Sequence, residues 1–305
     1  MLDFQAILEE IAEEVKPFLL SGKVASYIPE LSTINPNQFA MSLMCVDGTS
    51  YHVGDYQKRF SIQSISKLFT LTMAISLMDE ALWERIGKEP SGSSFNSLVQ
   101  LEYENGIPRN PFINAGALVV TDAILSHLPD AQYSVLAFIR KLAEQDDINF
   151  DFSVAKSEAN TGFRNRAMAH FIKSFNNLNH EPNRVLDAYF HHCSIAMNTQ
   201  ELCKAGFYLA NRGKQPWLKE AVLTTRQTKR VNALMLTCGT YDSVGDFAYR
   251  VGLPAKSGVG GGILASLPEA FSICVYSPGL NEKGNSLVGT KALELFTTKT
   301  KLSIF

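Results

Sequence analysis

The residues with the clearest chemical potential are two serine–lysine pairs, Ser64 with Lys67 and Ser153 with Lys156, each spaced as S-x-x-K. On a helix, positions i and i+3 share a face, so the lysine amine can approach the serine hydroxyl. A neutral amine could take the hydroxyl proton and make the serine a nucleophile, while amides at the helix start would stabilise developing negative charge. The spacing alone is not specific, because a helix-capping serine with a solvated lysine gives the same pattern.

The surrounding sequence favours Ser64 over Ser153. Residues 68–77 place apolar side chains at helical spacing, which predicts a buried helix that begins near Ser64. Far downstream stands Lys256-Ser257-Gly258, and S-x-x-K followed by K-[ST]-G is typical of serine β-lactamases and penicillin-binding proteins. We therefore take Ser64 as the candidate nucleophile.

A glycine-rich run, GVGGG at residues 258–262, follows Lys256 and Ser257. It has neither Walker spacing nor a complete G-x-G-x-x-G, which argues against a nucleotide site. A glycine-rich strand lets another backbone approach closely and can direct an amide at an oxyanion. A flexible turn or bulge is the alternative interpretation, and the position of the run after Lys256 favours a role in the site.

Other catalytic and metal-binding patterns are weak in this sequence. His191 and His192 stand beside Cys193, but a Cys-His dyad would need partners placed by the fold. The five cysteines contain no C-x-x-C, and the chain has neither H-E-x-x-H nor G-x-S-x-G. We expect no metal site and no organic cofactor.

Strand patterns lie towards both ends of the chain, with helices between them. Residues 39–46 and 51–53 flank an Asp-Gly turn, which predicts a hairpin. Residues 271–276 read as a strand and 290–298 as a closing helix, whereas residues 70–225 are mainly helical.

This order predicts an α+β fold: an antiparallel sheet built from both chain ends, helices packed on it, and an inserted helical domain. We expect residues 1–70 and 225–305 to form the sheet body and residues 71–224 the helical domain, with the active site between them. Within the helical part, Asn198 begins a capping box, and the helix that follows is predicted to continue to Arg212 and Gly213.

The composition is that of an ordinary globular enzyme: 305 residues, 46% hydrophobic, with a formal net charge of −2. The basic residues are scattered and form no basic patch of the kind that binds nucleic acid. No apolar stretch is long enough to cross a membrane. Acidic residues interrupt residues 1–20, which read as an amphipathic helix rather than a secretion signal. With scattered cysteines, these features predict a cytoplasmic protein.

Several separated blocks resemble the serine-dependent glutaminases of the bacterial and mitochondrial type, which share the S-x-x-K fold of β-lactamases and transpeptidases. In chain order they are GKVASYIP (22–29), FSIQSISK (60–67), GIPRNPFINAGA (106–117), SE (157–158), RN (164–165), YFHHCS (189–194), CGTY (238–241) and VGLPAKSGVGGG (251–262). The resemblance covers nearly the whole chain. It implies an amidohydrolase that converts L-glutamine to L-glutamate and ammonia.

Carried over by position, the resemblance implies a role for individual residues. Ser64 would be the acylated nucleophile, Lys67 its base, and Tyr241 the hydroxyl that passes a proton to the leaving ammonia. The backbone amides of Ser64 and Val259 would form the oxyanion hole. The substrate's α-amino and α-carboxylate groups would be held by Tyr27, Asn114, Glu158, Asn165 and Tyr189.

The resemblance also implies a homodimer or a homotetramer. Two alternatives stay open: a penicillin-recognising serine hydrolase, which would share the same framework, and a non-catalytic protein of the same fold. The role of Lys256 is open as well, because its charge could tune the site or serve the structure.

Overall fold

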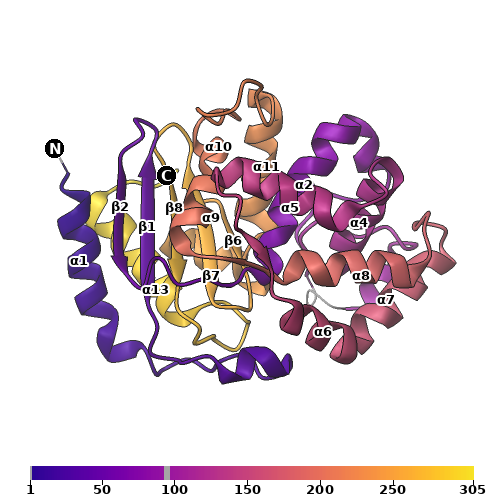
Figure 1. Cartoon of the computed structure of the whole chain (residues 1–305), viewed down its shortest axis with the longest axis horizontal. Helices are drawn as coiled ribbons and strands as arrows, with labels where there is room; N and C mark the ends of the chain where they lie inside the picture. Colours follow the sequence, from indigo (N-terminus) through magenta and orange to yellow (C-terminus); the bar gives the residue numbers. More distant parts are fainter. Residues whose placement is uncertain (1, 93–96) are drawn as a thin grey trace.

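The computed structural model describes residues 2–92 and 97–305, and its main feature is a five-stranded antiparallel sheet (Figure 1). The strand order is β2–β1–β8–β7–β6. Two strands come from the first part of the chain and three from the last: β1 (Ala40–Cys45), β2 (Ser50–Gly54), β6 (Ala255–Ser257), β7 (Gly262–Leu267) and β8 (Phe271–Tyr276). The predicted α+β fold, with a sheet built from both chain ends, is confirmed.

Strand β1 joins the two ends of the chain. On one side it forms the predicted hairpin with β2, in which Ala40 lies opposite Gly54. Gly48 in the connecting turn has a φ of +91°, which glycine adopts without a steric penalty. On its other side β1 pairs with β8, where Leu43 lies opposite Ile273.

Helices cover both faces of the sheet. On one face, α1 (Phe4–Val15) packs against β2 and α13 (Leu287–Thr300), as expected for the amphipathic N-terminal segment and the closing helix. On the other, α9 (Thr199–Ala205) and α10 (Phe207–Ala210) contact β8. Side chains alternate accordingly: Ile273 lies in the core beneath α1 and α13, and Cys274 in the core beneath α9. Helix α12 (Val244–Arg250) packs Phe247 into the core beneath α1 and α13.

Most of the remaining helices form a second layer beside the sheet, on the right of Figure 1. At its centre α2 (Ser66–Met78) packs on α4 (Asn114–His127), and α4 contacts α7 (Phe163–Ser174) and α8 (Pro182–Cys193). The other α-helices are α3 (Val99–Tyr103), α5 (Ala131–Ala143), α6 (Phe152–Thr161) and α11 (Thr225–Cys238). A small sheet joins β3 (Phe60–Ser61), β5 (Ile195–Met197) and β4 (Asn149–Phe150). No helix within residues 2–92 and 97–305 is long and apolar enough to cross a bilayer.

The segment after Asn198 differs in part from its prediction. The capping box is confirmed, because the Asn198 side chain accepts from the amide of Glu201 at 2.8 Å and Glu201 returns a bond to the Asn198 amide. The prediction of a single unbroken helix was wrong. The helix breaks at Gly206, where an added Cβ would lie 2.9 Å from the end of the Leu264 side chain of β7, so glycine lets this segment lie close to the sheet. Gly213 has the predicted left-handed conformation, with a φ of +86°.

The division into a sheet body (1–70 and 225–305) and a helical domain (71–224) stays a prediction. Helices α9 and α10 fall inside the predicted helical segment, and both contact the sheet.

A buried carboxylate ties α4 to the segment that leads into α8. Asp122 accepts hydrogen bonds from the amides of Asn179 at 2.9 Å and His180 at 2.8 Å, and from the Arg85 guanidinium at 2.6 Å. Burial alone would raise the pKa of Asp122, but these donors outweigh it and hold the pKa below its ordinary value. The network therefore fixes the relative positions of two helices that contribute side chains to the pocket described below.

We predict that Asp122→Asn lowers the free energy of unfolding by about 3–5 kcal/mol, because it leaves a buried guanidinium without its carboxylate. The folded-state pKa is depressed, so this stabilisation is present above the unfolded pKa of about 4 and disappears as the pH falls through the folded value. Denaturant unfolding at pH 7 and in strong acid measures both effects. The exposed Asp146→Asn is the control, and equal stability of the two variants at pH 7 would contradict the prediction.

Candidate active site

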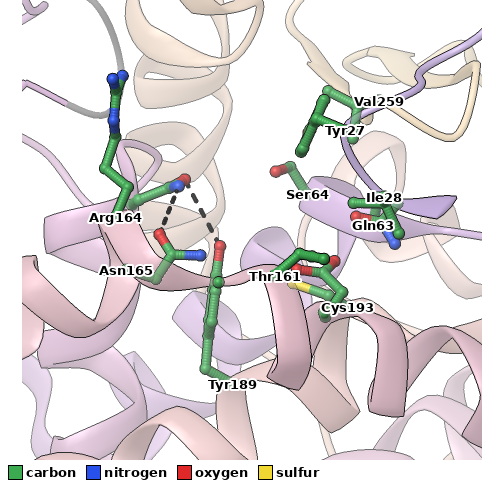
Figure 2. A pocket seen from close by; sticks show the side chains of 13 residues that line it. Tyr27, Ile28, Gln63, Ser64, Thr161, Arg164, Asn165, Tyr189, Cys193 and Val259 are labelled. Carbon is green, nitrogen blue, oxygen red and sulfur yellow. Dashed lines mark hydrogen bonds between the residues drawn. The ribbon is translucent and has the colours of Figure 1, made fainter.

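A pocket of about 430 Å³ gathers residues from well-separated parts of the chain. Figure 2 shows Ser64 between two walls, one with Arg164, Asn165 and Tyr189 and the other with Tyr27 and Val259. Seven of the nine residues predicted for catalysis or binding line this pocket: Tyr27, Ser64, Asn114, Glu158, Asn165, Tyr189 and Val259. The other two, Lys67 and Tyr241, are buried and contact residues of the wall.

The turn that carries Ser64 leads directly into α2. A 3₁₀ turn spans Gln63–Ile65, and α2 begins at the next residue, so Ser64 and Lys67 lie on the entering turn of a buried helix, as predicted. Gln63 has a φ of +49°, an uncommon conformation for a residue other than glycine. This local strain lies directly before the proposed nucleophile, where strained residues often mark functional sites.

Lys67 is buried and bonded to the opposite wall rather than to Ser64. Its amine donates to Asn114 Oδ1 at 2.6 Å and to the Phe112 carbonyl at 3.3 Å. Burial lowers the pKa of Lys67 to about 8, against the opposing influence of Glu158. A substantial fraction of the amine is therefore neutral at mildly alkaline pH and able to accept a proton.

Asn114 connects the predicted base with the predicted binding residues. Its Oδ1 accepts from Lys67 and lies 3.5 Å from the Tyr189 hydroxyl, and its Nδ2 donates to Asn165 Oδ1 at 3.0 Å. The two last contacts are drawn as dashed lines in Figure 2. Four helices, α2, α4, α7 and α8, thus meet through one amide side chain.

Tyr241 lies against the nucleophile from the other part of the chain. Its hydroxyl contacts Ser64, Ser257 and the backbone of Val259. Burial raises the pKa of Tyr241 well above its usual value, so the phenol stays protonated and can donate. The backbone of Tyr241 has a φ of +54°, which turns the residue into the site at the end of α11.

Lys256 is a second buried amine on the Tyr241 side. It donates to the Gly239 carbonyl at 2.9 Å and to the Ser257 carbonyl at 2.6 Å. Its amine lies 4.7 Å from the centroid of the Tyr241 ring, within the range of a cation–π contact. Burial and the charge of Lys67 hold the pKa of Lys256 well below its usual value. The amine therefore links the segment before Tyr241 to β6 and faces the tyrosine ring.

The glycine run packs backbone against backbone on the turn that carries Ser64. An added Cβ at Gly258 would lie 2.5 Å from the Ile62 carbonyl, and one at Gly260 would lie 2.2 Å from the Ser61 carbonyl. Gly261 has a φ of +101°. The run is therefore a tightly packed turn, and the absence of side chains is what brings Val259 next to Ser64.

Glu158 is the buried carboxylate of the pocket. Burial raises its pKa to about 7, although a hydrogen bond from Gln63 and the charge of Lys67 act in the opposite direction. Tyr27 lies at the pocket mouth and is 60% exposed. An ammonium group that entered the pocket would find this carboxylate as its partner.

Two weaker motifs have structural explanations. Cys193 lies in the pocket wall, but burial raises the pKa of its thiol to about 12, and the His192 ring lies 3.2 Å from the Ala131 carbonyl. The burial of the thiol and the separate partner of His192 argue against a Cys-His dyad. Ser153 and Lys156 of the second S-x-x-K are exposed on α6, and Ser153 bonds the N-cap Asp151.

Comparison with known proteins gives a consistent result. A family model described as Glutaminase matches residues 22–305, and a glutaminase of Agrobacterium fabrum is 55% identical over 100% of this chain and 99% of its own length. This chain belongs to the glutaminase family. A solved structure of the probable glutaminase ybaS superposes with a TM-score of 0.92 at 35% identity, covering 100% of this chain and 99% of the other.

A second solved structure carries a bound molecule. It is the covalent complex between the Bacillus subtilis glutaminase YbgJ and 5-oxo-L-norleucine, formed by reaction with 6-diazo-5-oxo-L-norleucine. Its TM-score is 0.86 at 32% identity, with 99% of this chain and 100% of the other covered. These matches confirm the resemblance and favour the glutaminase prediction over the penicillin-recognising alternative.

The structure of this glutaminase-family chain adds pocket residues to which the sequence analysis gave no role in this site. They are Ile28, Gln63, Thr161, Gly162, Arg164 and Cys193. Ile28, Gln63 and Arg164 stand next to predicted residues, and this adjacency was the available signal. The other three come into the wall only through the packing of α6, α7 and α8.

We predict that Gly260→Ala destabilises this chain and lowers its glutaminase activity, because the new Cβ would collide with the Ser61 carbonyl. Overpacking of this kind costs about 1–3 kcal/mol. Gly245→Ala is the matched control, since nothing lies within 4 Å of a Cβ at that position of α12. Thermal unfolding and kcat/KM of both variants check the prediction, and a Gly260→Ala protein indistinguishable from the control would refute the close approach.

Proposed function

We propose that this chain hydrolyses the side-chain amide of L-glutamine to L-glutamate and ammonia through an acyl-enzyme on Ser64. The observation that carries the proposal is one pocket in which Ser64 meets a buried lysine network, a protonated tyrosine and a buried carboxylate. The covalent complex of the Bacillus subtilis relative supports a nucleophile that attacks this type of ligand. The family match supports the reaction class.

In the first step Lys67 acts as the base. With a pKa of about 8, the neutral amine can take the Ser64 proton, and the hydroxyl oxygen attacks the Cδ carbonyl of glutamine. The amides of Ser64 and Val259 receive the developing oxyanion, and one such donor typically contributes about 3–4 kcal/mol to the lowering of the barrier. The tight packing of the glycine run supports this arrangement, because it holds the Val259 backbone beside Ser64.

Tyr241 then supplies the proton that ammonia needs in order to leave. Its hydroxyl contacts Ser64, and its raised pKa keeps the proton on the phenol until the C–N bond breaks. Water hydrolyses the resulting γ-glutamyl ester and regenerates the Ser64 hydroxyl. No step in this scheme uses a metal ion or an organic cofactor.

The other predicted residues recognise the α-groups of glutamine. Glu158 pairs with the α-ammonium, and neutral donors hold the α-carboxylate: Tyr27, Asn114, Asn165 and Tyr189. The buried positions of Glu158 and Tyr189 support this assignment, because a buried charge without a partner is costly and a ligand that lacks either α-group would leave one.

The proposal also covers the cellular location, the oligomeric state and the domain arrangement of the enzyme. We expect a cytoplasmic homodimer or homotetramer, with the site lying between a sheet body and a helical domain.

We predict that Ser64→Ala abolishes ammonia and glutamate release from L-glutamine, with a loss in kcat of at least about 10⁴-fold. Lys67→Ala has a comparable effect, because the hydroxyl then has no base. Ser153→Ala and Lys156→Ala, the same changes in the second S-x-x-K, are matched controls and keep wild-type turnover. Coupled detection of glutamate measures all four variants, and release that persists in Ser64→Ala would show that another residue is the nucleophile.

We predict that KM for glutamine rises as the pH falls below about 7, because only the ionised form of Glu158 pairs with the α-ammonium. Glu158→Gln raises KM by about 10–100-fold and removes this pH dependence. Glu220→Gln, at an exposed position, is the control. Initial rates between pH 6 and pH 9 provide the measurement, and an unchanged KM in Glu158→Gln would remove Glu158 from substrate binding.

A further inference from the structure

A second hollow adjoins the active-site pocket. It is a groove of about 690 Å³ whose lining includes Tyr27 and Val259, the same two residues that form one wall of the pocket. We call it the 21–27/280–284 groove, after the two segments that form its sides. Lys23 and Leu280 bridge these segments by backbone hydrogen bonds of 3.0 and 2.9 Å, so the groove has a fixed frame.

The groove extends up to the residues that handle the leaving group. A Cβ built on Gly284, at the edge of the groove, would lie 3.7 Å from the Val259 side chain and 3.8 Å from the Tyr241 ring. The φ of Gly284 is +84°, which disfavours a larger residue here. The backbone conformation thus favours glycine at this position, which lies next to Tyr241 and Val259.

The position of the groove relative to Ser64 indicates which end of the substrate faces it. In the proposed reaction Asn165 and Tyr189 hold the α-end of the substrate together with Tyr27, and they lie across the pocket from Val259 (Figure 2). The amide nitrogen that leaves receives its proton from Tyr241. A substituent on that nitrogen would extend past Tyr241 and Val259, where the groove begins at Gly284.

The charged groups of the groove indicate what kind of substituent it suits. Asp242, Glu282, Lys23 and Lys283 line it. The amine of Lys283 donates to the Asp242 carbonyl at 3.0 Å. Lys23 forms no side-chain ion pair or hydrogen bond with any residue that the structure describes. It is therefore the cation available to a carboxylate on the substituent.

We propose that the 21–27/280–284 groove is a leaving-group subsite that admits N-substituted γ-glutamyl amides, with Lys23 favouring substituents that carry a carboxylate. The inference rests on the proposed function and extends its substrate class. Ser64 forms an ester with Cδ, the C–N bond breaks, and the amine leaves with a proton from Tyr241, which recovers one from Ser64 through Lys67. Water then cleaves the ester to glutamate and restores the Ser64 hydroxyl.

The test compares three substrates: L-glutamine, γ-L-glutamylmethylamide and γ-L-glutamylglycine. We expect the wild type to cleave all three, and Lys23→Glu to lower kcat/KM for γ-glutamylglycine by about five-fold or more relative to the methylamide. The expected size follows from the modest strength of exposed charge pairs. Glutamine turnover stays within about two-fold of wild type, which shows that the variant is folded. Lys219→Glu, an exposed lysine outside the groove, is the control.

Each outcome decides one statement. If the wild type cleaves glutamine but neither substituted amide, the groove is not a leaving-group subsite, and the proposed function stands. If Lys23→Glu lowers kcat/KM for both substituted amides equally, or for neither, the assignment of Lys23 is wrong. If the wild type does not cleave glutamine, the proposed function itself fails.

Discussion

The site depends on one close approach of two backbones. The glycine run at 258–262 and the turn at 61–65 pack so tightly that a single methyl group would collide with a carbonyl at Gly258 or Gly260. This contact joins the strands of the C-terminal part to the helix that begins the helical layer. It places the Val259 backbone and Tyr241 next to Ser64. Without this contact, Ser64 would lie on a different surface from Val259 and Tyr241.

The second constraint is the burial of two lysine amines. Water would keep both Lys67 and Lys256 charged, but here each amine has only protein acceptors: an amide oxygen and a carbonyl for the first, two carbonyls for the second. Burial therefore lowers both pKa values. The same low-polarity surroundings keep Tyr241 protonated and make Glu158 a weaker acid. The shifted pKa values on which the proposed roles of Lys67, Tyr241 and Glu158 rest thus arise from one physical cause, burial.

The helical layer positions the binding side of the pocket. Asn114 links α2, α7 and α8 through three polar contacts, and Asp122 on the same helix fixes the chain that enters α8. Both are polar groups in a largely apolar core, where a hydrogen bond requires a defined geometry. The opposite side of the pocket, with Tyr27 and Val259, and the adjoining groove are formed by the two end parts of the chain.

The sequence by itself determined the fold class, the hairpin, strand β8, the closing helix and the family, because these follow from local periodicity, turn residues and ordered motifs. It also predicted nine site residues, most of them through the resemblance, and seven of these line one pocket. Tertiary structure decided the features that depend on contacts between distant segments. The helix that the sequence predicts to run from Asn198 to Arg212 breaks at Gly206, which packs against Leu264 of β7. Lys67 bonds Asn114 instead of Ser64, and Cys193 enters the pocket wall as a buried thiol with a raised pKa. These outcomes depend on burial and on contacts between distant segments, and such contacts exist only once the chain has folded.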